Sequence, residues 1–136
     1  MKKLTALCIP LLLTGCFLGD HVPEIYPARI VTVNDHVCIL VPAVKGEYLA
    51  YLDIEGTGSD KPLRKYVDEN SEPVYILPNE CVPLYGYKFE SGRAYGVSVS
   101  LQTKEKETKG KPWRAFSSSF SLWRDENNKL QAGSTY

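Results

Sequence analysis

Two segments in the C-terminal half alternate between apolar and small polar residues, and this alternation constrains the fold most strongly. In residues 95–101, a tyrosine and three aliphatic side chains alternate with Gly96, Ser98 and Ser100. In residues 113–123, two phenylalanines and a leucine alternate with serines. A period of two places successive side chains on opposite faces of a β-strand. Each segment therefore predicts a strand with one buried face and one face in water.

Shorter β-rich runs, bounded by residues that favour turns, occupy much of the remaining chain. Both faces of residues 36–41 are apolar, which predicts a central, buried strand. Tyr48, Ala50, Leu52 and Ile54 are expected on one face of the next strand. The further runs lie at residues 28–33, 63–67, 73–77 and 129–132, with a turn at Asn34-Asp35 and a charged loop at residues 104–111.

Six to eight short strands, with no helix expected, favour an all-β fold, an immunoglobulin-like antiparallel β-sandwich. A small β-barrel is the alternative. The residues before the strand at 95–101 are similar to a corner found in many sandwiches, where a tyrosine hydrogen-bonds back to the preceding loop. Tyr95 would be that tyrosine, or simply the first core residue of its strand.

The N-terminal sixteen residues have the pattern of a bacterial lipoprotein signal. Lys2 and Lys3 precede an apolar run at residues 4–13, which is too short to span a bilayer as a helix. Small residues then lead to Cys16. The alternatives are a plain secretory signal and a buried N-terminal helix. The lipoprotein interpretation predicts a signal peptide at residues 1–15, a lipidated tether at 16–27 and a β-sandwich domain at 28–136.

Lipidation of Cys16 predicts a periplasm-facing protein that acyl chains such as palmitate hold on the membrane. The residue after the anchor is Phe17 rather than the aspartate associated with retention in the inner membrane. We therefore expect the outer membrane rather than the inner one.

The cysteines agree with export to an oxidising compartment. Cys8 leaves with the signal and Cys16 carries the lipid, so Cys38 and Cys81 remain as a pair. We expect a disulfide between them. The alternatives are two free thiols or a metal site that includes His36, although a fourth ligand and a zinc-type spacing are absent from the sequence.

The composition argues against several classes of function. The 16 basic and 16 acidic residues become 14 and 16 when Lys2 and Lys3 are removed, so the mature chain has no basic excess for nucleic-acid binding. The serine run at 117–119 lacks the glycine-flanked turn of a hydrolase nucleophile. Acidic pairs fall on strands or turns, without evidence of a cleft. We expect no enzyme, no cofactor and no metal.

An interaction surface is therefore the main functional expectation. Nine tyrosines and two tryptophans exceed what a small core needs, and both residue types are common at protein interfaces. Packing between the sheets is the alternative for the tyrosines, and mere solubility is the alternative for the lysines. The candidate partner-binding residues are Tyr85, Tyr87, Lys104, Lys106, Lys109 and Trp113.

Nearly the whole chain resembles a family of small enterobacterial lipoproteins described as type VI secretion immunity proteins, with a domain of unknown function. The resemblance is carried by the lipobox at residues 13–16, a V-C-hydrophobic strand at Cys38, the segment 81–89 (CVPLYGYKF) and the strand start at 92–95. It implies a protein partner, namely a toxin delivered into the periplasm, and no catalytic residues. The alternatives are an envelope assembly lipoprotein and a glycan or small-molecule binder.

The lipoprotein interpretation predicts the behaviour of a Cys16→Ser variant. Without the thiol that accepts the lipid, the chain should remain unprocessed by the lipoprotein peptidase and should leave the membrane fraction. Fractionation and the mass of the N-terminal peptide measure both effects. Unchanged processing and unchanged membrane association would contradict the anchor.

Overall fold

A computed structural model describes residues 24–58, 61–68 and 70–134 of the chain. Cys16 and the predicted signal peptide lie outside the described residues. The fold is all-β and sandwich-like, as predicted, with a single short helix in this part of the chain. The elements are β1 (Ile25–Pro27), β2 (Arg29–Val33), β3 (His36–Leu40), β4 (Tyr48–Gly56), β5 (Leu63–Tyr66), β6 (Ala94–Gln102), α1 (Lys104–Thr108), β7 (Arg114–Arg124) and β8 (Leu130–Ser134).

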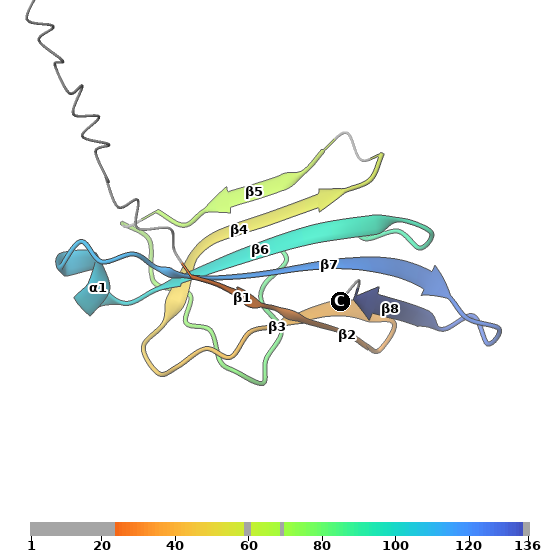
Figure 1. The fold of residues 1–136 in the computed structure, drawn as a ribbon, viewed down its shortest axis with the longest axis horizontal. Coiled ribbons are helices and arrows are strands. Elements are labelled where there is room, and N and C mark those ends of the chain that lie inside the picture. Colours follow the sequence, from red (N-terminus) through yellow and green to blue (C-terminus); the bar gives the residue numbers. More distant parts are fainter. Residues whose placement is uncertain (1–23, 59–60, 69, 135–136) are drawn as a thin grey trace, which may run out of the picture.

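The main sheet has the strand order β1–β7–β6–β4–β5, and β8 also pairs with β7 (Figure 1). Because β6 occupies one edge of β7, β1 and β8 share its other edge. β2 and β3 form a separate two-stranded sheet. Asn34 and Asp35 join them with positive φ angles of 50° and 63°, the backbone of a two-residue hairpin turn. The predicted turn is therefore confirmed.

One pair of strands departs from the purely antiparallel arrangement that the sequence predicts. β1 runs parallel to β7, with Ile25 opposite Ala115 and Pro27 opposite Ser117. The tether predicted for residues 16–27 was therefore wrong at its C-terminal end, because residues 25–27 belong to the sheet. Two prolines near this segment argued against a strand in the sequence analysis. A short edge strand tolerates proline, however, whereas a central strand does not.

A β-bulge in β4 changes the faces predicted for this strand. The pairing with β6 shifts between Leu49 and Tyr51, so Ala50 is the extra residue. The shift places Leu49 and Leu52 together in the core, both fully buried. The prediction that Tyr48 and Ala50 share one face with Leu52 and Ile54 was therefore wrong.

The core lies between the main sheet and a second layer that contains β3 and the irregular segment 73–90. The prediction that β3 is buried was confirmed, whereas its predicted central position was wrong, because β3 belongs to the two-stranded sheet. Ser100 is also buried, although its alternation with apolar residues predicted a solvated side chain. The largest buried side chains include Phe116, Phe120, Ile39, Leu49, Leu52, Ile54, Leu101 and Leu122.

The segment 73–90 covers the core without forming a strand. Residues 73–77 were predicted to be a strand, but among the described residues this run makes only an isolated bridge from Tyr75 to Tyr48. The segment is fixed by the predicted disulfide between Cys38 and Cys81, which is present. Next to it, the Val82 N–H donates to the Ile39 carbonyl at 2.9 Å. An irregular chain thereby substitutes for additional strands.

Tyr95 forms the corner that the sequence suggested. Its hydroxyl accepts a hydrogen bond from the Glu90 N–H at 2.7 Å and donates to the Glu90 carbonyl at 3.3 Å. Its ring is buried and stacks on Phe120, with ring centroids 5.7 Å apart. Tyr95 is therefore both a core residue and the link that holds the end of segment 73–90 to β6.

The charged residues 104–111 were predicted to form a loop, but they begin with the one-turn helix α1. Thr103 caps the helix, since its side-chain oxygen accepts a hydrogen bond from the Lys106 N–H at 3.2 Å. Lys109 and Glu105 form an i,i+4 ion pair at 2.8 Å. The cap and the ion pair stabilise this single helical turn. The turn was not predicted because its sequence has no apolar periodicity.

The disulfide should contribute strongly to stability. Replacing Cys38 and Cys81 together with alanine should lower the free energy of unfolding by about 4 kcal/mol, because the bridge closes a long loop. The separation in sequence is 43 residues. Urea unfolding of the variant and of reduced wild-type protein should give the same loss. Alkylation of both thiols in the native protein without reductant would contradict the bridge.

Candidate functional site

A buried ion pair organises the end of the molecule where α1 lies. The Arg114 guanidinium, at the start of β7, donates to both carboxylate oxygens of Glu47 at 2.9 and 2.6 Å. It also donates to the Pro42 carbonyl at 3.1 Å, while Glu47 accepts from the Val44 N–H at 2.8 Å. The Glu47 side chain is only 1 % exposed. The pair therefore joins the start of β7 to the loop that precedes β4.

The same ion pair sets the ionisation of Glu47. Burial disfavours the charged carboxylate, but hydrogen bonds from Arg114 and from the Val44 backbone outweigh it, so the pKa of Glu47 lies below its ordinary value. The Glu47 carboxylate in turn raises the pKa of Arg114. Both groups are therefore charged at neutral pH and form an intact ion pair. We call this ion pair the Glu47–Arg114 clamp.

The candidate site is a groove beside this clamp, on the face of the main sheet that points away from the core. We call it the aromatic groove. It has a volume of about 220 Å³ and its walls come from β4, β5, β6, α1 and the chain around them. Its side chains alternate with core residues such as Leu49 and Leu101 along the strands. The groove is lined by Tyr48, Ala50, Tyr66, Val67, Ser71, Pro73, Gln102, Lys104, Glu107 and Trp113.

One wall of the aromatic groove is a network of polar contacts around Tyr48. The Tyr48 hydroxyl donates to a carboxylate oxygen of Glu107 in α1, and this hydrogen bond lowers the pKa of Glu107. The Lys104 ammonium lies 3.5 Å from the same carboxylate and 5.4 Å from the centroid of the Tyr48 ring. The wall thus presents an aromatic ring flanked by one positive and one negative group.

The opposite wall is the open edge of the sheet, where Tyr66 of β5 is 70 % exposed. Its ring lies 4.4 Å from that of Tyr51 on β4, which is half-buried. Burial, then the charge of Asp53, raises the pKa of Tyr51 to about 12, so this hydroxyl stays protonated. The Tyr51 ring supports the Tyr66 ring and holds it beside the groove.

The six predicted partner-binding residues do not lie together. Lys104 and Trp113 line the aromatic groove, with Trp113 40 % exposed. Tyr85 is exposed on a turn beneath the Lys65 ammonium, 4.8 Å from its ring centroid. Tyr87 packs inward, with its ring 4.9 Å from Phe89 and 6.3 Å from Tyr95. Tyr87 therefore packs against other aromatic side chains, which was the alternative to a role in partner binding.

The two remaining predicted lysines do not line the groove, since Lys106 lies in α1 and Lys109 is the C-cap residue of this helix. Lys109 is paired with Glu105, and Lys106 is half-buried on the helix. Sequence reasoning missed the other lining residues, among them Tyr48, Tyr66 and Glu107. The sequence contains no signal for Tyr48, because only the bulge at Ala50, which the structure shows, turns this side chain away from the core.

The part of the chain that the structure describes contains no group of three or more His, Cys, Asp or Glu side chains that could hold a metal ion. The alternative of a metal site that includes His36 is excluded, because Cys38 and Cys81 are bonded to each other. Within the described residues, no helix is long and apolar enough to cross a membrane.

Comparison with known proteins identifies the family. DUF7480, a domain of unknown function, matches residues 25–125, which include every strand except β8. The chain belongs to this family. No curated protein and no solved structure matches it.

The clamp between Glu47 and Arg114 should make stability depend on pH. Because the pKa of Glu47 is lower in the folded state, its contribution is complete above the ordinary value of 4.5 and is lost as the pH falls through the lowered pKa. Glu47→Gln should lower the free energy of unfolding at pH 7 by about 2 kcal/mol. The difference from wild type should shrink as the pH falls from about 5 to 3.

Urea unfolding across this pH range measures the effect, and Glu55→Gln is the matched control. Glu55 pairs with Arg64 at 2.6 Å, but both side chains are more than half exposed. An exposed pair contributes at most about 1 kcal/mol. Equal losses in the two variants would contradict the role of the buried clamp.

Proposed function

We propose that this member of the DUF7480 family is a lipid-anchored, periplasm-facing module that binds another protein through the aromatic groove. The observation that carries the proposal is the convergence of Tyr48, Tyr66 and Trp113 on one groove beside the charges of Lys104 and Glu107. Tyrosine and tryptophan bury a large area with few rotatable bonds, so they are common anchors at protein interfaces.

The size of the groove supports a protein partner over a small-molecule ligand. Its volume of about 220 Å³ is below the range of about 300–1,000 Å³ typical of ligand pockets. A side chain or loop of a partner protein fits such a groove. On the adjoining sheet face, Ser98 lies opposite Ser117 on one side and Asp53 on the other, so small and charged side chains continue the surface beyond the groove.

The membrane anchor in this proposal rests on the sequence at residues 1–16. A basic start, a short apolar run and a cysteine after two small residues support cleavage before Cys16 and lipidation of its thiol. The disulfide between Cys38 and Cys81 is consistent with an oxidising compartment. Phe17 at the position after the anchor favours the outer membrane.

The partner we propose is a toxin that a type VI secretion apparatus delivers into the periplasm, and the mechanism is occlusion. The support is the resemblance carried by residues 13–16, 81–89 and 92–95. An immunity protein of this kind needs no catalytic group. It needs a surface that covers the toxin, and an anchor that keeps this surface where the toxin arrives.

The decisive experiment is competition between a deletion strain and its parent, with and without a working type VI apparatus in the parent. Immunity predicts that the deletion strain is lost only when the apparatus works. Equal survival in both mixtures would contradict immunity, and an envelope defect without any attacker would indicate an assembly role instead.

Complementation then tests the groove. Trp113→Ala should fail to restore survival, because loss of a central aromatic anchor costs about 2 kcal/mol, or about 30-fold in affinity. Trp123→Ala is the matched control, since Trp123 is similarly exposed but lies at the other end of β7. Binding of the purified toxin from the adjacent gene gives the affinities. Equal affinities of the two variants would contradict the aromatic groove as the interface.

A further inference from the structure

A second exposed surface is mainly apolar and adjoins the aromatic groove, because Tyr75 on it meets Tyr48 edge to face with ring centroids 6.4 Å apart. Residues 43–46 and 75–78 enclose a hollow of about 550 Å³. Val44, Tyr75 and Leu77 are each more than half exposed there. Lys45 is the only charged side chain among the described residues that line it. We call this surface the apolar patch; contiguous exposed apolar groups of this kind mark an interaction site.

The apolar patch lies at the end of the domain where the chain enters from its N-terminal segment. Ile25 pairs with Ala115, the residue after Arg114. The Arg114 guanidinium carbon lies 6.0 Å from the centroid of the Tyr26 ring, and Arg114 contacts Glu47, which accepts from Val44. These contacts connect the entry of the chain directly to the patch.

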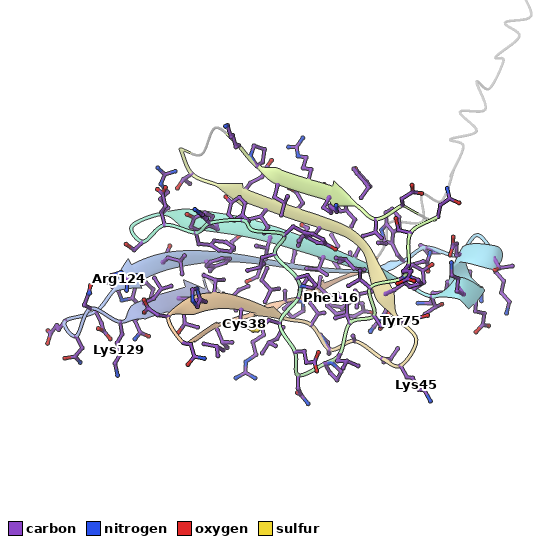
Figure 2. All side chains as sticks on the ribbon, turned by 180° about the vertical axis from the view of Figure 1, so that it is seen from behind. Cys38, Lys45, Tyr75, Phe116, Arg124 and Lys129 are labelled. Atoms are coloured by element: carbon purple, nitrogen blue, oxygen red, sulfur yellow. A yellow bond between two sulfur atoms is a disulfide. The ribbon has the colours of Figure 1, made fainter. Side chains whose placement is uncertain are left out.

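Figure 2 shows the two ends of the domain clearly. The labelled Lys45 and Tyr75 lie at the end where α1 lies, whereas Arg124 and Lys129 lie at the opposite end. β7, with eleven residues, spans most of the distance between them. At about 3.3 Å per residue this strand is about 35 Å long.

We infer that the apolar patch rests on the headgroup layer of the membrane that holds the lipid anchor. The inference rests on the proposed lipidation of Cys16. Only residues 17–23 separate Cys16 from the first described residue, Glu24. Fully extended, this segment reaches at most about 28 Å. The end with the patch therefore stays near the bilayer, and the tether is too short to let the domain stand inverted.

The chemistry of this end fits a membrane interface. Tyrosine is favoured at the boundary between headgroups and acyl chains, and aliphatic side chains such as Val44 and Leu77 enter it. Lysines attract anionic headgroups. Lys45 lies in the patch, and residues 104–111 at the same end contain four lysines and two glutamates.

The test uses the full mature protein, reconstituted with its lipid in vesicles of phosphatidylcholine and phosphatidylglycerol. Leu77→Trp is introduced together with Trp113→Phe and Trp123→Phe, so that the patch carries the only tryptophan. Lipids brominated in the upper acyl chains quench tryptophans that enter the interface. The control protein is Trp113→Phe, which keeps Trp123 at the far end. Quenching should be several-fold stronger for the tryptophan at position 77.

A second comparison separates the patch from effects on folding. Adding Val44→Asp to the reporter should reduce the quenching several-fold, whereas Val33→Asp should leave it unchanged. Val33 is similarly exposed but precedes the hairpin turn at the far end, where Asp35 pairs with Arg124 at 2.9 Å. Val44→Trp in place of Leu77→Trp provides a second reporter on the same surface and should be quenched equally.

Several outcomes would overturn the inference. Equal, weak quenching at positions 77 and 123 would show that the patch does not reach the membrane. A blue-shifted but unquenched reporter would show that residues 17–23 or a second copy of the chain cover it, and sedimentation would distinguish these. A mass without acyl chains would overturn both the anchor and the membrane contact. Binding through the aromatic groove is measured separately, by the Trp113→Ala variant.

Discussion

The buried pair of Glu47 and Arg114 is the interaction on which this end of the molecule depends. A carboxylate that is withdrawn from water must be paired and hydrogen-bonded, or it destabilises the fold. Here three donors meet that requirement, namely the Val44 N–H of the preceding loop and two N–H groups of the Arg114 guanidinium of β7. The preceding loop, β4 and β7 are therefore fixed relative to one another. The aromatic groove is lined by Tyr48 and the apolar patch by Gly46, the two chain neighbours of Glu47, so both surfaces depend on this pair for their shape.

The second layer of the fold is unusual because much of it is not regular structure. Two strands alone cannot cover a six-stranded sheet, so the segment 73–90 supplies Ile76 and Val82 to the core. An irregular segment loses more entropy on folding than its few backbone hydrogen bonds return. The disulfide at Cys81 and the hydroxyl of Tyr95 fix it at two places, in the middle and at its end. The disulfide and the hydrogen bonds of the Tyr95 hydroxyl thereby hold this segment in place without the backbone pairing of a β-strand.

The alternation in residues 95–101 and 113–123 was sufficient to predict the two central strands, because one face of each strand is buried and the other is partly in water. The disulfide followed from a simple count of cysteines. The bulge at Ala50 could not be predicted, since one additional residue leaves no mark on composition and yet exchanges the faces of the strand. β1 was missed because its pairing depends on residues about ninety positions away.

The candidate site was predicted only in part for the same reason. Trp113 and Lys104 were identified because they are exposed residue types near a charged turn. Tyr87 was assigned to the surface because its burial depends on Phe89 and Tyr95, which approach it only after the corner has formed. Composition indicates how many aromatic residues exceed the needs of a core, whereas tertiary contacts determine which of them are buried.

The pairing of β1 with β7 also has a consequence for the order of folding. β1 precedes its partner β7 by about ninety residues, and it has no other strand beside it among the described residues. Contacts so distant in sequence must close a large loop before they stabilise the chain, which slows folding. The hairpin of β2 and β3 can form early from local contacts. β1 can pair only after β7 has been synthesised, so a strand near the C-terminus fixes the first described strand of the chain.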